Sequence, residues 1–223
     1  MVETASVRAL RSIQAHGQYI RTAQALKVGI HPRTLSELLE SGDLEQISRG
    51  VYRLAELEPV SDPDLFTVAA RIPQGVICLV SALAIHQITT QIPRAVEIAL
   101  PRGAESPRLD YPPIALHRFS DASFSAGIED RQVDGISLRV YSPEKTIADC
   151  CKFRHRLGMD VFLEALTLYR QRKGANWAAI LEYAQICRVR TAIKPYLEAM
   201  QPTSSRLDRE KVILDKVDLK YQK

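Results

Sequence analysis

The chain has 223 residues, of which 46% are hydrophobic, 25% are charged and 6% are aromatic, and its formal net charge is +4. This length allows one large globular domain or two ordinary ones. The composition argues against a membrane protein, because no window approaches the roughly 18 uninterrupted apolar residues that span a bilayer. The N-terminal residues also lack the basic and then apolar pattern of a secretory signal.

Cysteine usage points to the same kind of protein. The four cysteines include no Cys-x-x-Cys pair, and two of them are adjacent. This spacing argues against a disulfide framework and against a zinc site of the usual kind. We therefore expect a protein of the reducing cytoplasm, without a metal ion or other cofactor.

The charges are unevenly distributed along the chain. Residues 1–55 carry 7 Lys/Arg and 5 Asp/Glu, residues 56–150 carry 8 and 13, and residues 151–223 carry 15 and 8. The acidic middle would repel a phosphate backbone, whereas the basic C-terminal part would attract one. A polyanion partner is one explanation of the basic part, and a solvated helical face is the other.

Two successive helices are predicted near the start, after a first helix over residues 3–16. The side chains that the first helix would turn inward are Val7, Leu10 and Ile13. The next helix begins at Thr22, whose hydroxyl can cap it, and ends at Gly29, where the chain must turn. Its expected apolar stripe is Ala23, Leu26 and Ile30.

A further helix is predicted to begin at Pro32, because a proline fits the first helical turn, and to end at Gly42. The spacing of its apolar residues places three leucines inward, namely Leu35, Leu38 and Leu39. The residues left on the outward face are Arg33, Thr34, Ser36 and Glu37.

Residues 44–54 then predict two short strands joined at Ser48-Arg49-Gly50, with Arg49 at the tip of the turn. Helices followed by such a hairpin are typical of a winged helix-turn-helix. This geometry suits DNA, since the major groove admits one helix while a β-ribbon reaches phosphates or the minor groove. Winged helices also serve as protein-interaction modules, and that alternative stays open.

The rest of the chain predicts a second, larger unit. Its expected strands are 76–80, 95–100, 114–118, 128–133 and 136–141, the last two joined by Asp134-Gly135. Its expected helices are 64–71, 81–86, 143–158, 160–174 and 176–186, with a further helix to about residue 200. The fold class is therefore α+β, with a winged helix-turn-helix at 1–56, a mixed domain with a small sheet and C-terminal helices at 64–201, and a charged tail at 202–223.

Catalytic patterns are scarce in this sequence. Cys151 and His155 are four residues apart on one predicted helix, but Cys151 lies on the apolar stripe and a packed thiol is the better interpretation. His86 and His117 have no carboxylate or cysteine at metal-ligand spacing. A nuclease is the enzymatic alternative, although Glu97 lacks a second carboxylate beside it. We therefore do not expect an enzyme.

Several of these residues resemble the AbiEi antitoxins of bacterial abortive-infection, or type IV, toxin–antitoxin systems. The resemblance covers about residues 8–200 and rests on four segments. They are Thr22-Ala-Gln-Ala-Leu with Gly29, then Arg49-Gly-Val-Tyr52, then Ser81-Ala-Leu-Ala84, and Ser142-Pro-Glu-Lys-Thr-Ile-Ala-Asp149. The chain departs from the family at His31, where a serine or similar helix cap is common.

The resemblance implies a transcriptional repressor of its own operon that binds inverted repeats in the promoter. It also implies antitoxin activity in the C-terminal domain against a nucleotidyltransferase toxin, generally without a stable complex. The residues expected to contact DNA are Arg21, Lys27, His31, Arg33, Thr34, Ser36, Glu37 and Arg49. A candidate second polyanion-binding face comprises Lys152, Arg154, Arg156, Arg170, Arg172, Lys173, Arg188, Arg190 and Lys194.

Overall fold

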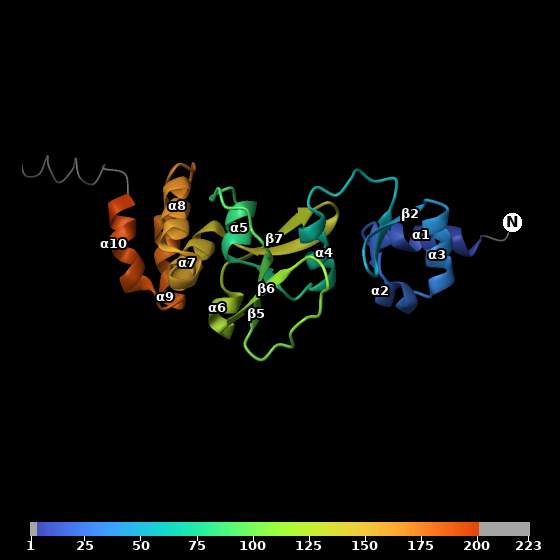
Figure 1. Cartoon of the computed structure of the whole chain (residues 1–223), viewed down its shortest axis with the longest axis horizontal. Helices are drawn as coiled ribbons and strands as arrows, with labels where there is room; N and C mark the ends of the chain where they lie inside the picture. Colours follow the sequence, from blue (N-terminus) through green and yellow to red (C-terminus); the bar gives the residue numbers. More distant parts are fainter. Residues whose placement is uncertain (1–3, 201–223) are drawn as a thin grey trace, which may run out of the picture.

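The structure is a computed structural model that describes residues 4–200. These residues form a three-stranded and a five-stranded sheet together with helices. Figure 1 shows an elongated arrangement, with the N-terminal helices at one end, the larger sheet in the middle and helices α7 to α10 at the other end. The expected α+β fold class is confirmed, and the predicted charged tail at 202–223 lies outside the described residues.

The N-terminal region is consistent with a winged helix-turn-helix. Its elements are α1 (Ala5–Ala15), β1 (Tyr19–Arg21), α2 (Thr22–Lys27), α3 (Pro32–Glu40), β2 (Leu44–Ser48) and β3 (Val51–Leu54), and its strand order is β1-β3-β2. Ile13, Ile20, Leu35 and Leu38 are buried together in its core. The predicted hairpin is confirmed, whereas β1 was not expected, because three residues are too few for a clear alternating pattern.

Some inward positions of the first two helices were predicted wrongly. Val7, Ala23 and Leu26 are exposed, and Ala25 is the buried residue of α2. Because α2 has only six residues, it is too short for apolar periodicity to indicate which of its residues are buried. Thr22 is not the cap of α2 either: Arg21 holds that position, and its backbone N–H donates to Gln24 Oε1 at 3.1 Å.

The middle region carries the five-stranded sheet, in the order β6-β5-β4-β8-β7. Its elements are α4 (Pro63–Arg71), β4 (Val76–Ile77), α5 (Leu79–Ile85), β5 (Val96–Pro101), β6 (Ile114–Phe119), α6 (Asp121–Ser125), β7 (Ile128–Val133) and β8 (Ile136–Tyr141). Strand β4 is antiparallel to β5 and parallel to β8. The β7–β8 hairpin has the predicted bounds, and its turn residues Asp134 and Gly135 have φ values of 50° and 81°.

The strand predicted at 76–80 is shorter than expected. Strand β4 ends at Ile77, and the rest of the apolar run enters helix α5. That helix begins at Leu79 rather than at residue 81, and Cys78 precedes it. An apolar run of five residues does not distinguish a buried strand from a buried helical turn, and here the pairing with β5 stops after two residues. Helix α6 was not expected.

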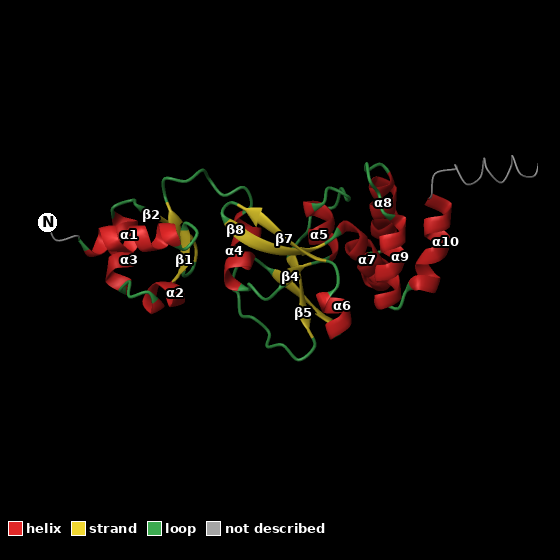
Figure 2. Ribbon diagram, turned by 180° about the vertical axis from the view of Figure 1, so that it is seen from behind, coloured by secondary structure: helices red, strands yellow, loops and turns green. Residues whose placement is uncertain are grey.

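The last helices form a layer beyond the sheet (Figure 2). They are α7 (Pro143–Leu157), α8 (Met159–Arg170), α9 (Trp177–Ile186) and α10 (Arg190–Met200). Ser142 and Asn176 cap α7 and α9, accepting from the N–H groups of Lys145 and Ala179. Gly158, with φ of 105°, precedes α8, and Asp160 lies inside the first turn of that helix.

The two faces of the larger sheet bury different partners. One face, including Val76 and Tyr141, packs against the α7–α10 helices. The other face, including Ile77 and Val140, packs with α4, where Phe66 in turn contacts the N-terminal region. The rings of Tyr19 and Phe66 meet edge to face at 5.6 Å. The N-terminal sheet and the larger sheet are therefore joined by continuous apolar contacts through α4.

Candidate nucleic-acid interface

Helix α3 begins with a histidine side chain as its cap. The Arg33 N–H donates to His31 Nδ1 at 3.2 Å, and Pro32 occupies the first helical turn. His31 thus takes the capping role that a serine would fill. This cap places Arg33 in the first turn of the helix, where a winged helix-turn-helix directs residues toward base edges.

The outward face of α3 carries three of its four predicted residues. Arg33, Ser36 and Glu37 are exposed, and the Arg33 side chain is 83% exposed. Its Nε donates to Glu37 Oε1 at 3.0 Å, so a base contact by Arg33 would replace this surface pair. Thr34 is a correction, because only 8% of it is exposed. It lines a hollow together with Ala9 and Ser12 of α1, so it lies toward α1 rather than on the outward face.

Helix α2 contributes less charge than expected. Lys27 is exposed in its last turn, where a lysine can reach a phosphate. Arg21 is half-buried, and its Nε donates to Gln24 Oε1 at 3.1 Å. Arg53, on β3, is buried and therefore does not add to the exposed charge of this region. It pairs with Glu45 at 3.1 Å and donates to the Glu58 carbonyl oxygen.

The tip of the hairpin lies against the middle region of the chain. The Arg49 side chain is 92% exposed and its Nη1 lies 3.7 Å from Asp110 Oδ2. Arg71, at the end of α4, donates to the Arg49 carbonyl oxygen at 2.7 Å. A hollow of about 180 Å³ beside this contact is lined by the tip on one side and by Leu109 and Tyr111 on the other. Sequence reasoning missed Arg71, because nothing local indicates that an arginine ending one helix supports a turn 22 residues earlier.

Five residues of the candidate second polyanion-binding face form two separated groups. Arg170, Arg172 and Lys173 lie at and beyond the C-terminal end of α8, whereas Arg188 lies between α9 and α10 and Arg190 is the first residue of α10. The ten residues of α9 separate these positions by about 15 Å, and Figure 1 shows the two connections at opposite ends of the helical layer. The remaining members are Lys152, Arg154 and Arg156 near the end of α7, and Lys194 on α10. Arg154 is half-buried and donates to the Cys151 carbonyl oxygen at 2.8 Å.

The Ser-Pro-Glu-Lys-Thr-Ile-Ala-Asp segment, which opens α7 in the helical layer, has buried charges. Lys145 Nζ and Asp149 Oδ2 are 2.5 Å apart and both side chains are fully buried. The ammonium also lies 4.1 Å from the centre of the Tyr141 ring. Burial raises the pKa of Asp149, and the Lys145 ammonium opposes that rise. The i, i+4 spacing of a lysine and an aspartate was the signal that could have revealed this pair.

The candidates for catalysis are engaged in packing or structural hydrogen bonds. All four cysteines are buried, and burial raises the pKa of the Cys187 thiol to about 11. His86 Nε2 lies 2.6 Å from the Tyr141 carbonyl oxygen, and burial lowers the pKa of its ring. The Glu97 carboxylate accepts from the Val80 N–H at 2.6 Å. Residues 4–200 contain no group of three His, Cys, Asp or Glu side chains that could hold a metal ion.

No helix within the described range combines the length and the apolar character that a membrane crossing needs. No curated protein matches this chain. Among solved structures, the chain is similar to the crystal structure of the RV2827C protein from Mycobacterium tuberculosis, with a TM-score of 0.50 and 16% sequence identity. The match covers 92% of this chain and 84% of that chain, and at this identity it concerns the fold alone.

A family model matches the region that contains α2, α3 and the hairpin. The model is described as "Transcriptional regulator, AbiEi antitoxin", and it matches residues 8–55. This range includes both predicted recognition elements, Arg33 on α3 and Arg49 at the hairpin tip. The resemblance drawn from the sequence is thereby confirmed: residues 8–55 of this chain match the AbiEi family of antitoxins and transcriptional regulators.

Proposed function

We propose that this chain is a DNA-binding transcriptional autorepressor and the antitoxin of a type IV, or abortive-infection, toxin–antitoxin system. It binds inverted repeats in its own promoter and counters a nucleotidyltransferase toxin. The observation that carries the proposal is an exposed arginine in the first turn of α3, within the segment that matches the AbiEi family. The chain acts in the cytoplasm, as a protein of antiviral defence.

In this proposal the two DNA elements have different tasks. Helix α3 enters the major groove, and Arg33 donates to guanine O6 and N7, a contact that discriminates by about 1–3 kcal/mol. Ser36 lies on the same exposed face and contacts the neighbouring base or phosphate. Arg49 and Lys27 contact phosphates, which position the protein without specifying sequence.

We extend the proposal to the division of the chain. Residues 1–56 form the DNA-binding domain and residues 64–201 the antitoxin domain. The basic residues of the helical layer extend the DNA footprint, because the covalent connection raises their local concentration at the bound duplex. Since these residues form two separated groups, only the group that faces the duplex contributes.

The first experiment is a gel shift and a footprint on the promoter upstream of the gene, over a series of salt concentrations. Wild type is expected to protect a repeated sequence, and Arg33→Ala is expected to lose that protection while keeping a weak, salt-sensitive shift. Arg118→Ala serves as the matched control, since Arg118 is an exposed arginine on β6, away from the N-terminal region. Absence of specific binding would favour the alternative, a protein-interaction module that docks on a partner enzyme.

The salt series also tests the helical layer. Reversing the charges of Arg170, Arg172 and Lys173 in one variant, and those of Arg188 and Arg190 in another, compares the two groups directly. If one of these groups contacts DNA, the variant that reverses its charges should show a flatter dependence of log K for DNA binding on log salt concentration. If both slopes equal that of wild type, the layer does not contact the duplex.

The antitoxin activity is tested with the full chain in cells. Co-expression with the product of the neighbouring gene should restore growth, and pull-down should show whether a stable complex accompanies that rescue. An Arg33→Ala variant that still rescues growth would separate antitoxin activity from DNA binding. A toxin that remains lethal in the presence of wild type would contradict this part of the proposal.

A further inference from the structure

One loop in the middle region presents a large apolar side chain to solvent. Ile92, between α5 and β5, is 90% exposed, the largest value among the exposed large hydrophobic residues of the described range. The loop is held in place, because the hydroxyls of Thr89 and Thr90 donate to the two carboxylate oxygens of Glu164 on α8, at 2.7 and 2.5 Å. Ile92 is therefore displayed by a supported loop.

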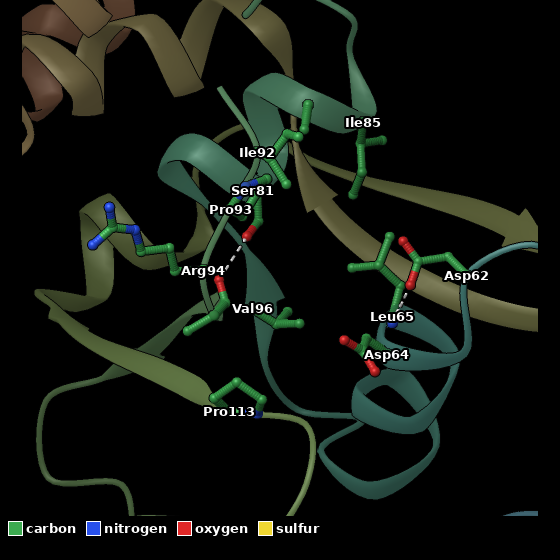
Figure 3. Close-up of a pocket in the computed structure, with 12 residues that line it drawn as sticks. Asp62, Asp64, Leu65, Ser81, Ile85, Ile92, Pro93, Arg94, Val96 and Pro113 are labelled. Carbon is green, nitrogen blue, oxygen red and sulfur yellow. Dashed lines mark hydrogen bonds between the residues drawn. The ribbon is translucent and has the colours of Figure 1, made fainter. Parts of the chain in front are cut away.

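A hollow lies on each side of this loop. The first has a volume of about 370 Å³ and is walled by Leu65, Ile85 and Val96, as Figure 3 shows. The second has a volume of about 420 Å³ and is walled by Val80, Leu157 and Val161. Residues 92–95 line both hollows. An apolar projection thus stands directly beside a mainly apolar hollow and a hollow of mixed polar and apolar lining, each large enough to receive a side chain of its own size.

Opposite charges border the first hollow. Asp62 and Asp64 lie at the rim formed by α4, and Arg94 lies at the rim formed by the loop, extending away from the acidic pair (Figure 3). Asp62 caps α4 by accepting from the Leu65 N–H at 2.9 Å. Within residues 4–200 neither Asp64 nor Arg94 has an ion-pair partner, so both charges are available to a molecule that covers the hollow.

We propose that this surface, the Ile92 patch, binds a second copy of the chain about a two-fold axis. The patch consists of Ile92, Arg94, Asp64 and the walls of the first hollow. In an isologous contact each copy offers the same surface, so a projection next to a recess is self-complementary. Ile92 of each copy enters the first hollow of the other, and Arg94 of each copy faces Asp64 of the other.

A second copy accounts for more of the patch than a small molecule does. A small apolar molecule in the hollow would leave Ile92 in water and both charges unpaired. A stable interface buries about 800 Å² on each partner, so the contact requires the loop and the surface around the first hollow rather than Ile92 alone. The inference goes beyond the proposed function and needs no DNA. Two recognition helices related by a two-fold axis would nevertheless suit an inverted repeat.

The test is sedimentation velocity of the full chain, without DNA, over a concentration series. Wild type is expected to shift toward the dimer mass as concentration rises, and Ile92→Asp is expected to stay monomeric. Because Ile92 is exposed, the variant should keep the wild-type circular dichroism spectrum and melting temperature. Leu26→Asp is the matched control: Leu26 is also an exposed apolar residue but lies on α2, outside the patch, so that variant should still dimerise.

A charge exchange identifies the contact itself. Arg94→Asp alone would place two acids opposite each other, and Asp64→Arg alone would place two bases opposite each other, so each single variant should dimerise less than wild type. The double variant should recover the dimer, since the pair is restored across the axis. A wild-type chain that remains monomeric at every concentration overturns the proposal. An Ile92→Asp variant that dimerises as wild type does, or a double variant no better than the singles, overturns it equally.

Discussion

The two segments that carry the family resemblance use their charges in opposite ways. In the N-terminal region, Arg33 and Arg49 have side chains that are 83% and 92% exposed. In the segment that opens α7, Lys145 and Asp149 are completely buried. Both segments combine basic and acidic residues, so composition alone does not separate them. The difference is that an exposed ion pair can exchange its partner for a ligand, whereas the buried charges are held by each other.

This contrast assigns different consequences to substitution in the two segments. An exposed ion pair such as Arg33–Glu37 contributes little to folding, because water and salt screen it. A buried pair contributes little net stability as a pair, yet loss of one partner leaves an uncompensated charge in an apolar surrounding. Substitution of the buried pair in α7 should therefore lower the free energy of unfolding. Substitution on the exposed face of α3 should instead lower the affinity for DNA.

The largest effect is expected at the buried pair. Asp149→Ala leaves the Lys145 ammonium unpaired beneath Tyr141 and Phe119, and we expect it to lower the free energy of unfolding by about 3–5 kcal/mol. Urea unfolding followed by circular dichroism measures the change. A variant too unstable to purify would agree with this expectation, provided that a gentler variant behaves as described next.

The gentler variant removes both charges. Lys145→Met with Asp149→Leu replaces the pair by apolar side chains of similar volume, and this double variant should be substantially more stable than Asp149→Ala. Under conditions in which they remain folded, both variants should bind promoter DNA with the affinity of wild type. A double variant as unstable as the single would show that hydrogen bonding by Asp149, such as that from Cys187 at 3.2 Å, matters more than the ion pair.

The adjacent residues Arg33 and Thr34 sharpen the comparison within one helix. Arg33→Ala should weaken binding to the promoter site by about 1–3 kcal/mol with little change in stability. Thr34→Val preserves the shape of a buried side chain and should leave promoter affinity unchanged. Fluorescence anisotropy with specific and scrambled duplexes measures both variants. Equal losses of affinity in the two variants would show that α3 acts through its fold rather than through an exposed base contact.

Helix α3 also shows which features sequence could and could not predict. Pro32, Gly42 and the spacing of Leu35 and Leu38 fixed its bounds, because capping and apolar periodicity are local properties. The burial of Thr34 depends on α1, which packs across the helix, and no local pattern reports that contact. The hairpin over residues 44–54 was likewise predictable from its turn chemistry.

Features that depend on distant parts of the chain escaped prediction. Strand β4 stops at Ile77 because its pairing with β5 stops there, whereas the apolar run continues to Val80. Arg71 and Asp110, which are remote from the hairpin in sequence, both contact Arg49 at its tip. The basic residues of the C-terminal helices looked like one face in sequence, yet the antiparallel course of the helices separates them.

Dependence on pH provides a smaller test of the buried histidine. Burial lowers the pKa of His86 from its ordinary value of 6.5, so the unfolded chain binds the proton more readily than the folded one. Its contribution to stability is therefore complete above pH 6.5 and declines as pH falls below that value toward the lowered pKa. Urea unfolding between pH 8 and pH 5 should show this decline, and His86→Gln should reduce it. A slope that is the same in the variant would assign the decline to other groups.

The smallest effect is expected at the cap of α3, where the exposed and the structural roles meet. His31→Ala removes the acceptor for the Arg33 N–H and should cost about 1 kcal/mol of stability, whereas His31→Ser supplies a replacement acceptor and should cost less. Since the cap fixes the first turn, the alanine variant should also weaken promoter binding slightly, and the serine variant should not. Thermal unfolding and anisotropy measure the two properties side by side. If both variants lose affinity while only the alanine variant loses stability, His31 contacts the DNA directly in addition to capping the helix that presents Arg33.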